Sequence, residues 1–309
     1  FARELGIEEL HYVYLDTRRS RSNAPVRYAY QAVKTLRLLF QKRPEVVFVQ
    51  NPPSFAVPFV YLYCALSGGV YIIDSHSDVF QRDFWNRPRW LHRFLAKKAA
   101  ATIVTDEHFQ ARVNEWGGRS RIIRDPITPY ATAEFPTNGG FSVVVVNKYA
   151  DDEPLAEVLA AAAELEDISF YVTGKKSKAN PEMLAKATSN VCFTDFLPDA
   201  QYYGLLNACQ VVMSLTTRDH TLQCGACEAM SLEKPVITSN WPLLQSYFHR
   251  GTVHVDNTSE DIRRGIVEIK ANYEAYTAGM RELRKQHREE WERNVVELTQ
   301  LIRQTAEGG

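Results

Sequence analysis

His76 and Asp78 stand just past an apolar run, Val70–Asp74, where a buried strand is predicted to give way to a polar turn. Histidine can serve as an acid, a base or a hydrogen-bond donor near neutral pH, and a carboxylate can take a proton from a hydroxyl group. We therefore predict that His76 is a catalytic side chain and that Asp78 is a second candidate. The structural alternative is that Asp74 and His76 only cap the turn.

The segment Val211–Asn240 holds a second group of residues that could bind a ligand. An apolar run there ends in a polar loop, a helix is predicted to begin near Leu222, and Glu228 falls on its second turn. The first turn of a helix offers backbone N–H groups to a phosphate, and Gln223 and Gly225 lie on that turn, where the glycine leaves room for close approach. The alternative for Glu228 is a solvated carboxylate on the helix surface.

The elements that position these residues alternate along the first half of the chain. Short apolar runs are typical of strands that are buried on both faces, and stretches with helix-period apolar residues separate them. The predicted strands are His11–Leu15, Val46–Gln50, Val70–Asp74, Thr102–Thr105 and Arg121–Ile123, and the predicted helices are Val26–Lys42, Ser54–Ser67, Arg89–Lys98 and Asp106–Trp116. The pattern predicts a parallel α/β sheet.

The alternation stops at Pro126–Gly140, which holds three prolines and two glycines and is predicted to be an interdomain linker. A second α/β series follows. Its predicted strands are Ser142–Asn147, Ser169–Thr173, Val191–Phe193, Gln210–Ser214, Pro235–Thr238 and Thr252–Val255, its helices include Glu153–Glu164 and Tyr202–Ala208, and the tail from Asp261 to Gln304 is predicted to be helical. Two doubly wound domains place a ligand at the carboxyl ends of the strands, in the cleft between the domains.

Length and composition are those of a two-domain globular protein. The chain has 309 residues, of which 45% are hydrophobic and 24% are charged, a balance that argues against disorder. Its longest apolar stretch, Phe55–Leu66, is shorter than the about 20 residues of a membrane-spanning helix. The five cysteines are odd in number and lie in apolar segments, which indicates a reducing compartment rather than a disulfide framework.

Charge is divided unequally between the two halves. Residues 1–140 carry 19 Lys and Arg against 13 Asp and Glu, whereas residues 141–309 carry 17 against 24. Opposite signs suggest different partners for the two domains, with the basic half facing something anionic, although chance variation of surface charge gives the same counts. The chain opens on FARELG, which resembles the middle of a helix. We therefore expect a first strand and its loop to precede it.

The stretch EAMSLEKPVI, from Glu228 to Ile237, resembles the glycosyltransferase family 4 group and its relatives of the GT-B fold. The signature of that group is a glutamate, seven intervening residues, a second glutamate followed by Ala-Met, and a Lys-Pro-Val-Ile strand. The resemblance implies that Glu228 accepts hydrogen bonds from the ribose of a nucleoside diphosphate sugar. The first glutamate of the signature would fall at position 220, where this sequence has His220.

The stretch VVVVNKYADDEPL, which follows the linker, resembles the start of the donor domain in the same superfamily. Its Asp-Glu pair at 152–153, the Gln-Asn-Pro-Pro stretch and the Asp-x-His stretch resemble the chitobiosyldiphosphodolichol β-mannosyltransferases. A GT-B enzyme without a metal neutralises the leaving phosphate with Lys, Arg and helix dipoles, so the resemblance implies this role for Lys148 and Lys175. Each is equally well read as a solvated loop lysine, and the Asp-Glu pair as the start of a helix.

These resemblances imply an α/β chain of the GT-B fold, with two Rossmann-like, doubly wound domains that face a cleft and a C-terminal helix that crosses back, anchored by Trp291. The expected domains are an acceptor-side domain at 1–135, a nucleotide-sugar domain at 136–285 and the C-terminal helix at 286–309. The expected activity is glycosyl transfer from a nucleoside diphosphate sugar to a glycan, lipid-linked or small-molecule acceptor, without a cofactor or bound metal. A nucleotide-sugar 2-epimerase and, because of His220, a non-catalytic nucleotide-sugar binder are the alternatives.

The segment Asp83–Lys98 mixes five basic residues with two tryptophans and two phenylalanines. This combination suits a membrane interface with anionic lipids, and the alternative is a surface helix with an apolar inner face. We expect a cytoplasmic protein that contacts the inner face of the membrane through this segment and binds no nucleic acid. His220, Cys224 and Cys227 have helical spacing, but the second cysteine pair of a structural zinc site is absent, so we predict no metal site.

Overall fold

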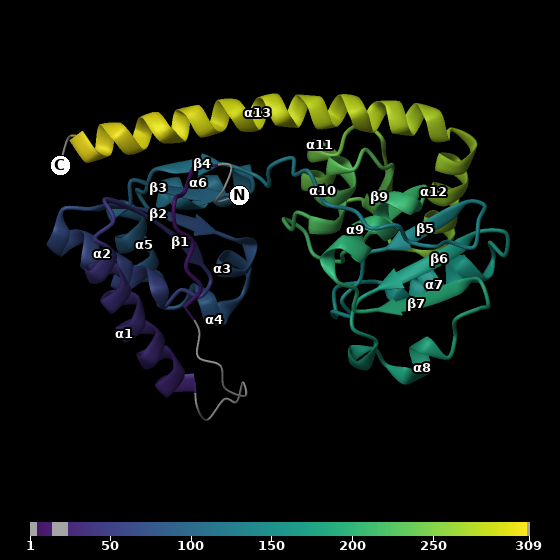
Figure 1. Ribbon diagram of the computed structural model, residues 1–309, viewed down its shortest axis with the longest axis horizontal. Coiled ribbons are helices and arrows are strands. Elements are labelled where there is room, and N and C mark those ends of the chain that lie inside the picture. The colour runs from purple at the N-terminus through teal and green to yellow at the C-terminus, as the bar shows by residue number, and fades with distance from the viewer. Residues whose placement is uncertain (1–4, 14–23, 308–309) are drawn as a thin grey trace. The chain divides into compact units, whose positions relative to one another are not determined.

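The computed structural model describes residues 5–13 and 24–307, which form two compact α/β units (Figure 1). Unit 1 comprises residues 1–126 together with 290–309, and unit 2 comprises residues 127–289. Each unit contains its own parallel sheet and its own hydrophobic cores.

Four parallel strands form the sheet of unit 1 within the described residues, in the order β1-β2-β3-β4. The strands are β1 (Val46–Asn51), β2 (Val70–Ser75), β3 (Ala101–Val104) and β4 (Ser120–Ile122), and the helices are α1 (Ala24–Lys42), α2 (Ala56–Ser67), α3 (Ser77–Gln81), α4 (Asp83–Asn86), α5 (Arg89–Lys98) and α6 (Glu107–Glu115). The predicted strands from Val46 onward and the four predicted helices of this half are confirmed, with their ends shifted by one or two residues.

Alternate residues of the strands in unit 1 pack into different cores. Val47 and Val49 of β1 contact a core to which α1, α2 and α5 contribute, whereas Val46 and Phe48 contact a core that contains Leu298 near the end of the chain. Side chains alternate along a strand, so a strand that is covered on both faces is apolar throughout its length. This is why unbroken apolar runs located the strands correctly.

Six parallel strands form the sheet of unit 2 within the described residues, in the order β10-β9-β8-β5-β6-β7. The strands are β5 (Ser142–Val145), β6 (Ser169–Thr173), β7 (Val191–Asp195), β8 (Val211–Ser214), β9 (Val236–Ser239) and β10 (Thr252–Val255), and the helices are α7 (Leu155–Ala163), η1 (Lys176–Lys178), α8 (Pro181–Leu184), α9 (Asp199–Ala208), α10 (Cys224–Ser231), α11 (Pro242–Tyr247) and α12 (Ser259–Ala271). The chain runs outward from β5 to β7 and then outward on the other side from β8 to β10. This is the predicted doubly wound topology.

Helices cover both faces of the sheet in unit 2. Helices α7 and α12 pack with Val143 and Val145 on one face, and α9, α10 and α11 pack with Val144 on the other. The central strands of this sheet are therefore covered on both faces.

The predicted linker contains no helix or strand, but most of it packs along unit 2. Ile127 is buried, the N–H of Ala133 donates to the carbonyl of Ala200 at 2.8 Å, and the N–H of Asn138 donates to the hydroxyl of Tyr171 at 2.8 Å. Gly204 of α9 permits this contact, because a Cβ atom there would lie 2.0 Å from the carbonyl oxygen of Ala133. The segment from Ile127 to Asn138 therefore contacts unit 2 at several points along its length.

The last helix, α13 (Tyr273–Glu307), contributes to both units. Its first part places Met280 and Leu283 in the core of unit 2, and its later part buries Leu298 in the core of unit 1, where Trp291 also packs. Trp291, predicted as the anchor of this helix, is one of several partly buried residues that pack there, and Leu298 is the more deeply buried residue. The tail, predicted as one helical region, is divided into α12 and α13 at Asn272.

Three local predictions need correction. In the strand predicted at His11–Leu15, residues 11–13 form no strand, and residues 14 and 15 lie outside the described residues. The helix predicted near Leu222 begins two residues later, at Cys224. Helix α3, which follows β2 directly, was expected to be a turn, because five residues are too few to show a helical period.

Candidate functional site

The carboxyl edge of the sheet in unit 2 is the first candidate site. Strand order reverses between β5 and β8, and ligands of doubly wound sheets bind outside the carboxyl ends of the strands at such a reversal. The chain leaves this point through residues 146–154 after β5 and residues 215–223 after β8. Lys148, His220 and Gln223 lie in these loops, and α10, with Gly225 and Glu228, follows directly.

Asp152 ties these two loops together. Its Oδ2 accepts a hydrogen bond from the hydroxyl of Thr216 at 3.0 Å, and its backbone oxygen accepts one from the N–H of Thr217 at 2.8 Å. Thr216 is completely buried. Helix α7 begins only at Leu155, so the carboxylate of Asp152 cross-links the loops instead of starting the helix.

The neighbouring carboxylate, Glu153, shapes the loop after β5. Its Oε2 accepts hydrogen bonds from the N–H groups of Lys148, at 2.9 Å, and Ala150, at 3.0 Å. Burial raises the pKa of Glu153, whereas these two N–H donors act to lower it. The pair at 152–153 therefore holds the loop on which Lys148 is exposed.

Side chains beneath the loop after β8 hold its backbone at Thr216. The hydroxyl of Ser239 accepts a hydrogen bond from the N–H of Thr216 at 2.8 Å and donates to Asn257 Oδ1 at 2.7 Å. The carbonyl oxygen of Thr216 in turn accepts from Asn257 Nδ2 at 3.0 Å and from Trp241 Nε1 at 2.9 Å. Both backbone groups of Thr216 are thus satisfied by fixed partners, so the base of this loop is preorganised.

Lys148 and Lys175 are brought to adjacent loops. Gly174, whose φ of +99° is in the left-handed region, lets the end of β6 approach the loop after β5: a Cβ atom there would lie 2.2 Å from the oxygen of Asn147 and 3.1 Å from Lys148 Cα. Both lysines are exposed, and neither ammonium group forms an ion pair with a described residue. Two positive charges are therefore available at this edge for an anionic ligand.

Helix α10 starts against the end of β5. Gly225 is buried, and a Cβ atom on it would lie 2.8 Å from Val146 Cβ, so the glycine allows the helix and strand to pack closely. This packing accounts for Gly225, in place of the predicted open surface. Gln223 precedes the helix and its Oε1 accepts from Ser214 Oγ at 3.3 Å. The N-terminus of α10, which favours anions, thus lies beside the loop that carries Lys148.

Glu228 is half-buried on α10 and has a partner that sequence reasoning missed. The hydroxyl of Tyr202, on α9, donates to Glu228 Oε2 at 2.6 Å. Burial and the adjacent carboxylate raise the pKa of Tyr202, so its hydroxyl stays protonated and remains a donor. This bond orients the carboxylate of Glu228, a group that has about four acceptor sites.

His220 occupies a strained position in the loop after β8. Its φ is +53°, in a region that histidine tolerates better than most residues, and its N–H donates to Asp219 Oδ1 at 2.6 Å. Its ring Nε2 lies 3.6 Å from Asp219 Oδ2, and 35% of its side chain is exposed. The position at which the resemblance implies a glutamate therefore presents an imidazole next to a carboxylate.

In unit 1, His76 lies at the carboxyl end of β2. Its N–H donates to the carbonyl of Asn51, the last residue of β1, at 2.8 Å. Its ring Nε2 lies 3.5 Å from Asp74 Oδ2 and 3.3 Å from Gln50 Nε2, with 48% of the side chain exposed. His76 precedes α3, but its side chain makes no capping hydrogen bond to that helix. The turn-capping alternative is therefore wrong for this side chain.

The surroundings of His76 favour the protonated ring. A hydrogen bond to Asp74 raises the pKa of His76, and the charges of Asp125 and Asp78 act in the same direction, whereas burial opposes them. Protonated Nε2 can donate to Asp74, and neutral Nε2 can accept from the amide of Gln50. Both partners contact Nε2, so the ring can take up and return the proton of a ligand at Nδ1 while Nε2–H donates to Asp74.

Asp78 lies in the first turn of α3, where its Oδ1 forms an ion pair with Arg82 Nε at 3.0 Å. The carboxylate in hydrogen-bond contact with His76 is that of Asp74, which the sequence suggested only as a turn cap. The signal that could have found it is the spacing of two residues, because alternate residues at a strand end share a face.

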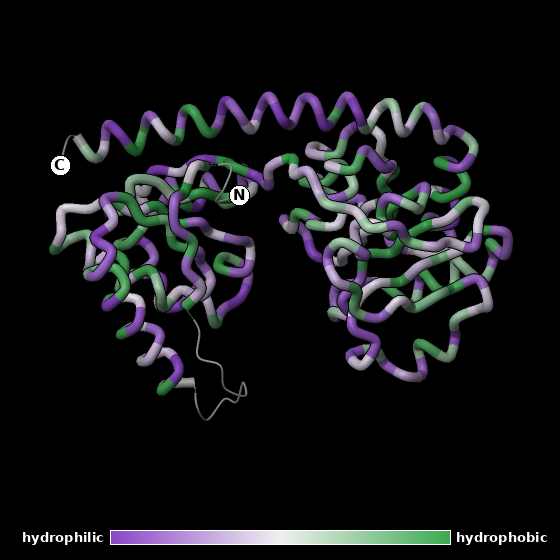
Figure 2. The backbone as a smooth tube through the Cα atoms, viewed as in Figure 1, coloured by the Kyte–Doolittle hydropathy of each residue, from purple (hydrophilic) through white to green (hydrophobic). Residues whose placement is uncertain are grey.

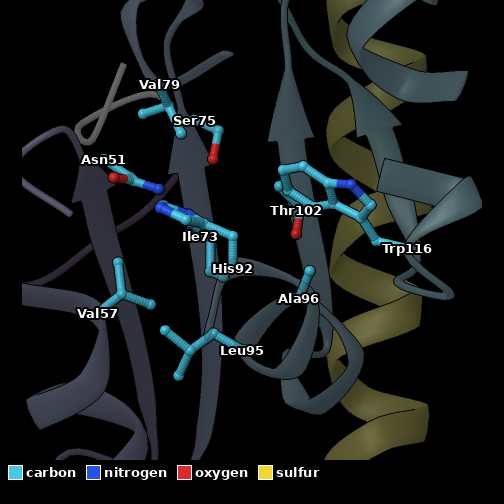
Figure 3. Close-up of a pocket in the computed structure, with 10 residues that line it drawn as sticks. All are labelled: Asn51, Val57, Ile73, Ser75, Val79, His92, Leu95, Ala96, Thr102 and Trp116. Carbon is cyan, nitrogen blue, oxygen red and sulfur yellow. The ribbon is translucent and has the colours of Figure 1, made fainter. Parts of the chain in front are cut away.

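A small cavity lies inside unit 1, beneath the carboxyl ends of β1 and β2 (Figure 3). Asn51, Ser75 and Thr102 line it together with His92 and Trp116, and its volume is about 10 Å³. A volume of this size accommodates one water molecule, whereas ligand pockets measure about 300–1,000 Å³. The cavity is thus too small for a sugar or a nucleotide.

Two kinds of feature are absent from the part of the chain that the structure describes. Among these residues, no group of three or more His, Cys, Asp or Glu side chains could hold a metal ion. Among the same residues, no helix combines the length and apolar content that crossing a bilayer requires.

Comparison with protein families gives one match, which covers residues 153–298 and is described as glycosyl transferase-like. The matched span contains the loop after β8, all of α10 and Lys175, whereas Lys148 and His76 precede it. No curated protein matches this sequence.

Solved structures share the architecture at low sequence identity. HepE of Anabaena in complex with UDP-glucose has a TM-score of 0.68 at 15% identity, over 90% of this chain and 82% of HepE. Trehalose 6-phosphate synthase from Burkholderia multivorans has a TM-score of 0.64 at 12% identity, over 92% and 78%. A candidate UDP-N-acetylglucosamine 2-epimerase from Listeria monocytogenes has 0.56 at 12% identity, over 86% and 75%. These matches confirm the predicted GT-B fold class.

Proposed function

We propose that this protein is a glycosyltransferase that moves a sugar from a nucleoside diphosphate sugar to an acceptor hydroxyl group. The observation that carries the proposal is the reversal of strand order in unit 2, where Lys148, Lys175 and the start of α10 come together. The family match over residues 153–298 supports it. The structure of HepE contains UDP-glucose, which supports a nucleotide sugar as donor.

Each donor-site residue has a role that its chemistry permits. Glu228, oriented by Tyr202, would accept hydrogen bonds from the ribose hydroxyl groups. Lys148 and Lys175, with the N-terminus of α10, would neutralise the charge that develops on the departing diphosphate, so that no metal or cofactor is needed. Gln223 and His220 would contact the donor at the loop after β8.

In unit 1, we assign the proton transfer to His76. Neutral His76, with its Nε2–H donated to Asp74, would take the proton of the acceptor hydroxyl at Nδ1, and Asp74 would stabilise the imidazolium that results. Asp78 remains a second candidate, although its ion pair with Arg82 lowers its availability.

The identity of the acceptor is proposed on the sequence alone. We propose a glycan, lipid-linked or small-molecule acceptor, handled in the cytoplasm by an enzyme similar to family 4 and to the β-mannosyltransferases. Residues 83–98 would contact the inner face of the membrane, and nucleic acid would not be a partner.

The proposal is tested by incubating the protein with a panel of UDP-sugars and GDP-sugars, with and without a chelator, and following the products by NMR. Release of nucleoside diphosphate, with the sugar transferred or freed in the presence of the chelator, is the expected result. Formation of an epimer would favour the 2-epimerase, and calorimetric binding without turnover would favour the non-catalytic binder. A variant with both His76→Ala and Glu228→Ala controls for contaminating enzymes.

A further inference from the structure

Exposed apolar side chains are concentrated on unit 1. Among the described residues, all of the large hydrophobic side chains that are exposed belong to unit 1 except Phe196 and Val267. Both units nevertheless have buried cores of their own. A concentration of exposed apolar residues on one part of a protein marks a surface that binds something.

Helix α1 has two apolar faces, of which only one is covered. Leu39 is buried in the core of unit 1. Val26, Tyr30, Val33 and Phe40 lie on another face, at the spacing of three, four and seven residues that aligns side chains along a helix, and all four are exposed. Val26 and Val33 are 69% and 68% exposed, so the stripe is open to solvent along the helix.

The exposed apolar surface continues from α1 onto its neighbours. Helix α2 contacts both α1 and α5 and forms a layer with them (Figure 1). On α2, Leu66 is 68% exposed, and on α5, Trp90 is 69% exposed and lies one helical turn from the exposed Phe94. Phe94 also contacts the ring of Tyr61 of α2, with 5.1 Å between centroids. We call the exposed side of these three helices the α1–α2–α5 face.

The charge of this face has one sign. Helices α1, α2 and α5 contain eight Lys and Arg residues and no Asp or Glu. In Figure 2, apolar and polar segments alternate along α1, where Lys34 and Arg37 lie beside the apolar stripe and are exposed. On α5, Arg93 and Lys97 are exposed in the same way. Lys42, one of these eight residues, lies at the end of α1 and forms an ion pair with Glu9. We therefore assign it no role in binding a partner.

We propose that the α1–α2–α5 face docks on the surface of an anionic lipid bilayer. Aliphatic and aromatic side chains such as Val33 and Trp90 enter the headgroup region, and the basic side chains between them contact lipid phosphates. The absence of any acidic residue from the three helices is the complementarity that an anionic surface requires. The face extends well beyond residues 83–98, and it contains no residue of the proposed donor or catalytic site.

The test is sedimentation of the intact protein with vesicles of phosphatidylcholine alone or mixed with phosphatidylglycerol. Binding is expected only to the mixed vesicles and should weaken as salt is raised. The double variant Lys34→Ser, Arg37→Ser should bind about 30-fold less tightly, from about 1 kcal/mol for each basic residue near the surface. Val33→Ser and Trp90→Ser should each weaken binding about fivefold or more.

Matched controls come from unit 2. Val267→Ser replaces an exposed helical valine, and Lys186→Ser with Arg250→Ser removes the same charge from exposed positions. Equal losses for these variants, equal binding to both kinds of vesicle, or no vesicle binding would overturn the proposal. Dissociation of a self-associated species by Val33→Ser in analytical ultracentrifugation, without any change in vesicle binding, would overturn it in favour of a second copy of this chain. None of these readouts depends on glycosyl transfer.

Discussion

The carboxyl edges of the two sheets use their polar residues in different ways. In unit 2, Thr216 and Ser239 are completely buried and are bonded to groups that fix the loop after β8. In unit 1, the side chain of His76 is 48% exposed, that of Asp74 is 27% exposed, and the two are partners of each other. At the base of the loop after β8 the bonds join buried neutral groups, whereas the edge of unit 1 presents a half-exposed group that can titrate.

The difference indicates a division of labour. Bonds among buried neutral groups preorganise a surface, which suits binding of a ligand with a fixed arrangement of phosphates and hydroxyl groups. A half-exposed imidazole beside a carboxylate suits the transfer of a proton. If this comparison holds, substitution of His76 should change turnover, whereas substitution of Glu228 or Asp152 should change binding or stability.

The largest effect is expected from His76→Ala. Turnover should fall about 10²–10⁴-fold, the usual contribution of general acid–base catalysis, while calorimetry should show an unchanged affinity for nucleoside diphosphate. The side chain makes no capping hydrogen bond, so the melting temperature should change little. Near-normal turnover would remove His76 from the mechanism and leave Asp78 as the candidate.

Glu228→Ala should weaken binding of UDP or GDP by at least tenfold. Two charge-assisted hydrogen bonds to the ribose would be lost, each of about 1.5–3 kcal/mol in the gross. The same change removes the acceptor of the hydroxyl of the half-buried Tyr202, which should destabilise the fold by about 1–3 kcal/mol.

Glu228→Gln separates these two effects, since the amide oxygen can still accept from Tyr202. Its melting temperature should stay close to that of the wild type while affinity falls. Glu182→Ala, which changes an exposed glutamate of α8, is the matched control and should alter neither. Unchanged calorimetric affinity in both Glu228 variants would show that the ribose role does not apply to this chain.

The sequence predicted the strands well because both faces of each sheet are covered. Val46 to Gln50 and Val211 to Ser214 are unbroken or nearly unbroken apolar runs, and short runs of this kind are typical of strands that are buried on both faces. The short helix α3 was missed because local hydrogen bonding and its position after β2 determine it, not an apolar period.

The candidate site was predictable only where its residues lie close together in the sequence. The stretch from Glu228 to Ile237 could be identified as a motif, whereas Tyr202 comes from α9, 26 residues earlier, and meets Glu228 only because α9 and α10 pack on the same face. The sequence predicts that Gly225 leaves room for a ligand. A glycine cannot show, in the sequence alone, whether a ligand or the side chain of Val146 occupies the space beside it, and here it is Val146.

Asp152→Ala tests the preorganisation of unit 2. Removing the carboxylate leaves the buried hydroxyl of Thr216 without this acceptor, which should destabilise unit 2 by about 1–3 kcal/mol. That loss corresponds to a fall in melting temperature of several degrees, measurable by calorimetry. Asp151→Ala, one residue away and exposed, should leave the melting temperature unchanged. If the two variants behave alike, the tie between the loops does not stabilise this edge.

Asp74→Asn should give the smallest effect, a shift in the pH dependence of turnover. The wild-type rate should rise with pH as His76 loses its proton, since the neutral ring is the proposed base. Asp74 raises the pKa of His76, so the amide should move this rise to lower pH, and the variant should keep a larger share of its maximum rate in acid.

The stability of the Asp74→Asn variant should respond in the opposite sense. A histidine with a raised pKa stabilises the fold below its unfolded pKa, and this contribution is lost as the pH rises through the folded value. The variant should therefore be less stable than the wild type in acid and equally stable above the pKa of His76. Turnover and denaturation are measured at the same pH values for both proteins. If the pH dependence of turnover is the same in the variant and the wild type, Asp74 does not raise the pKa of His76, and the two edges differ less than proposed.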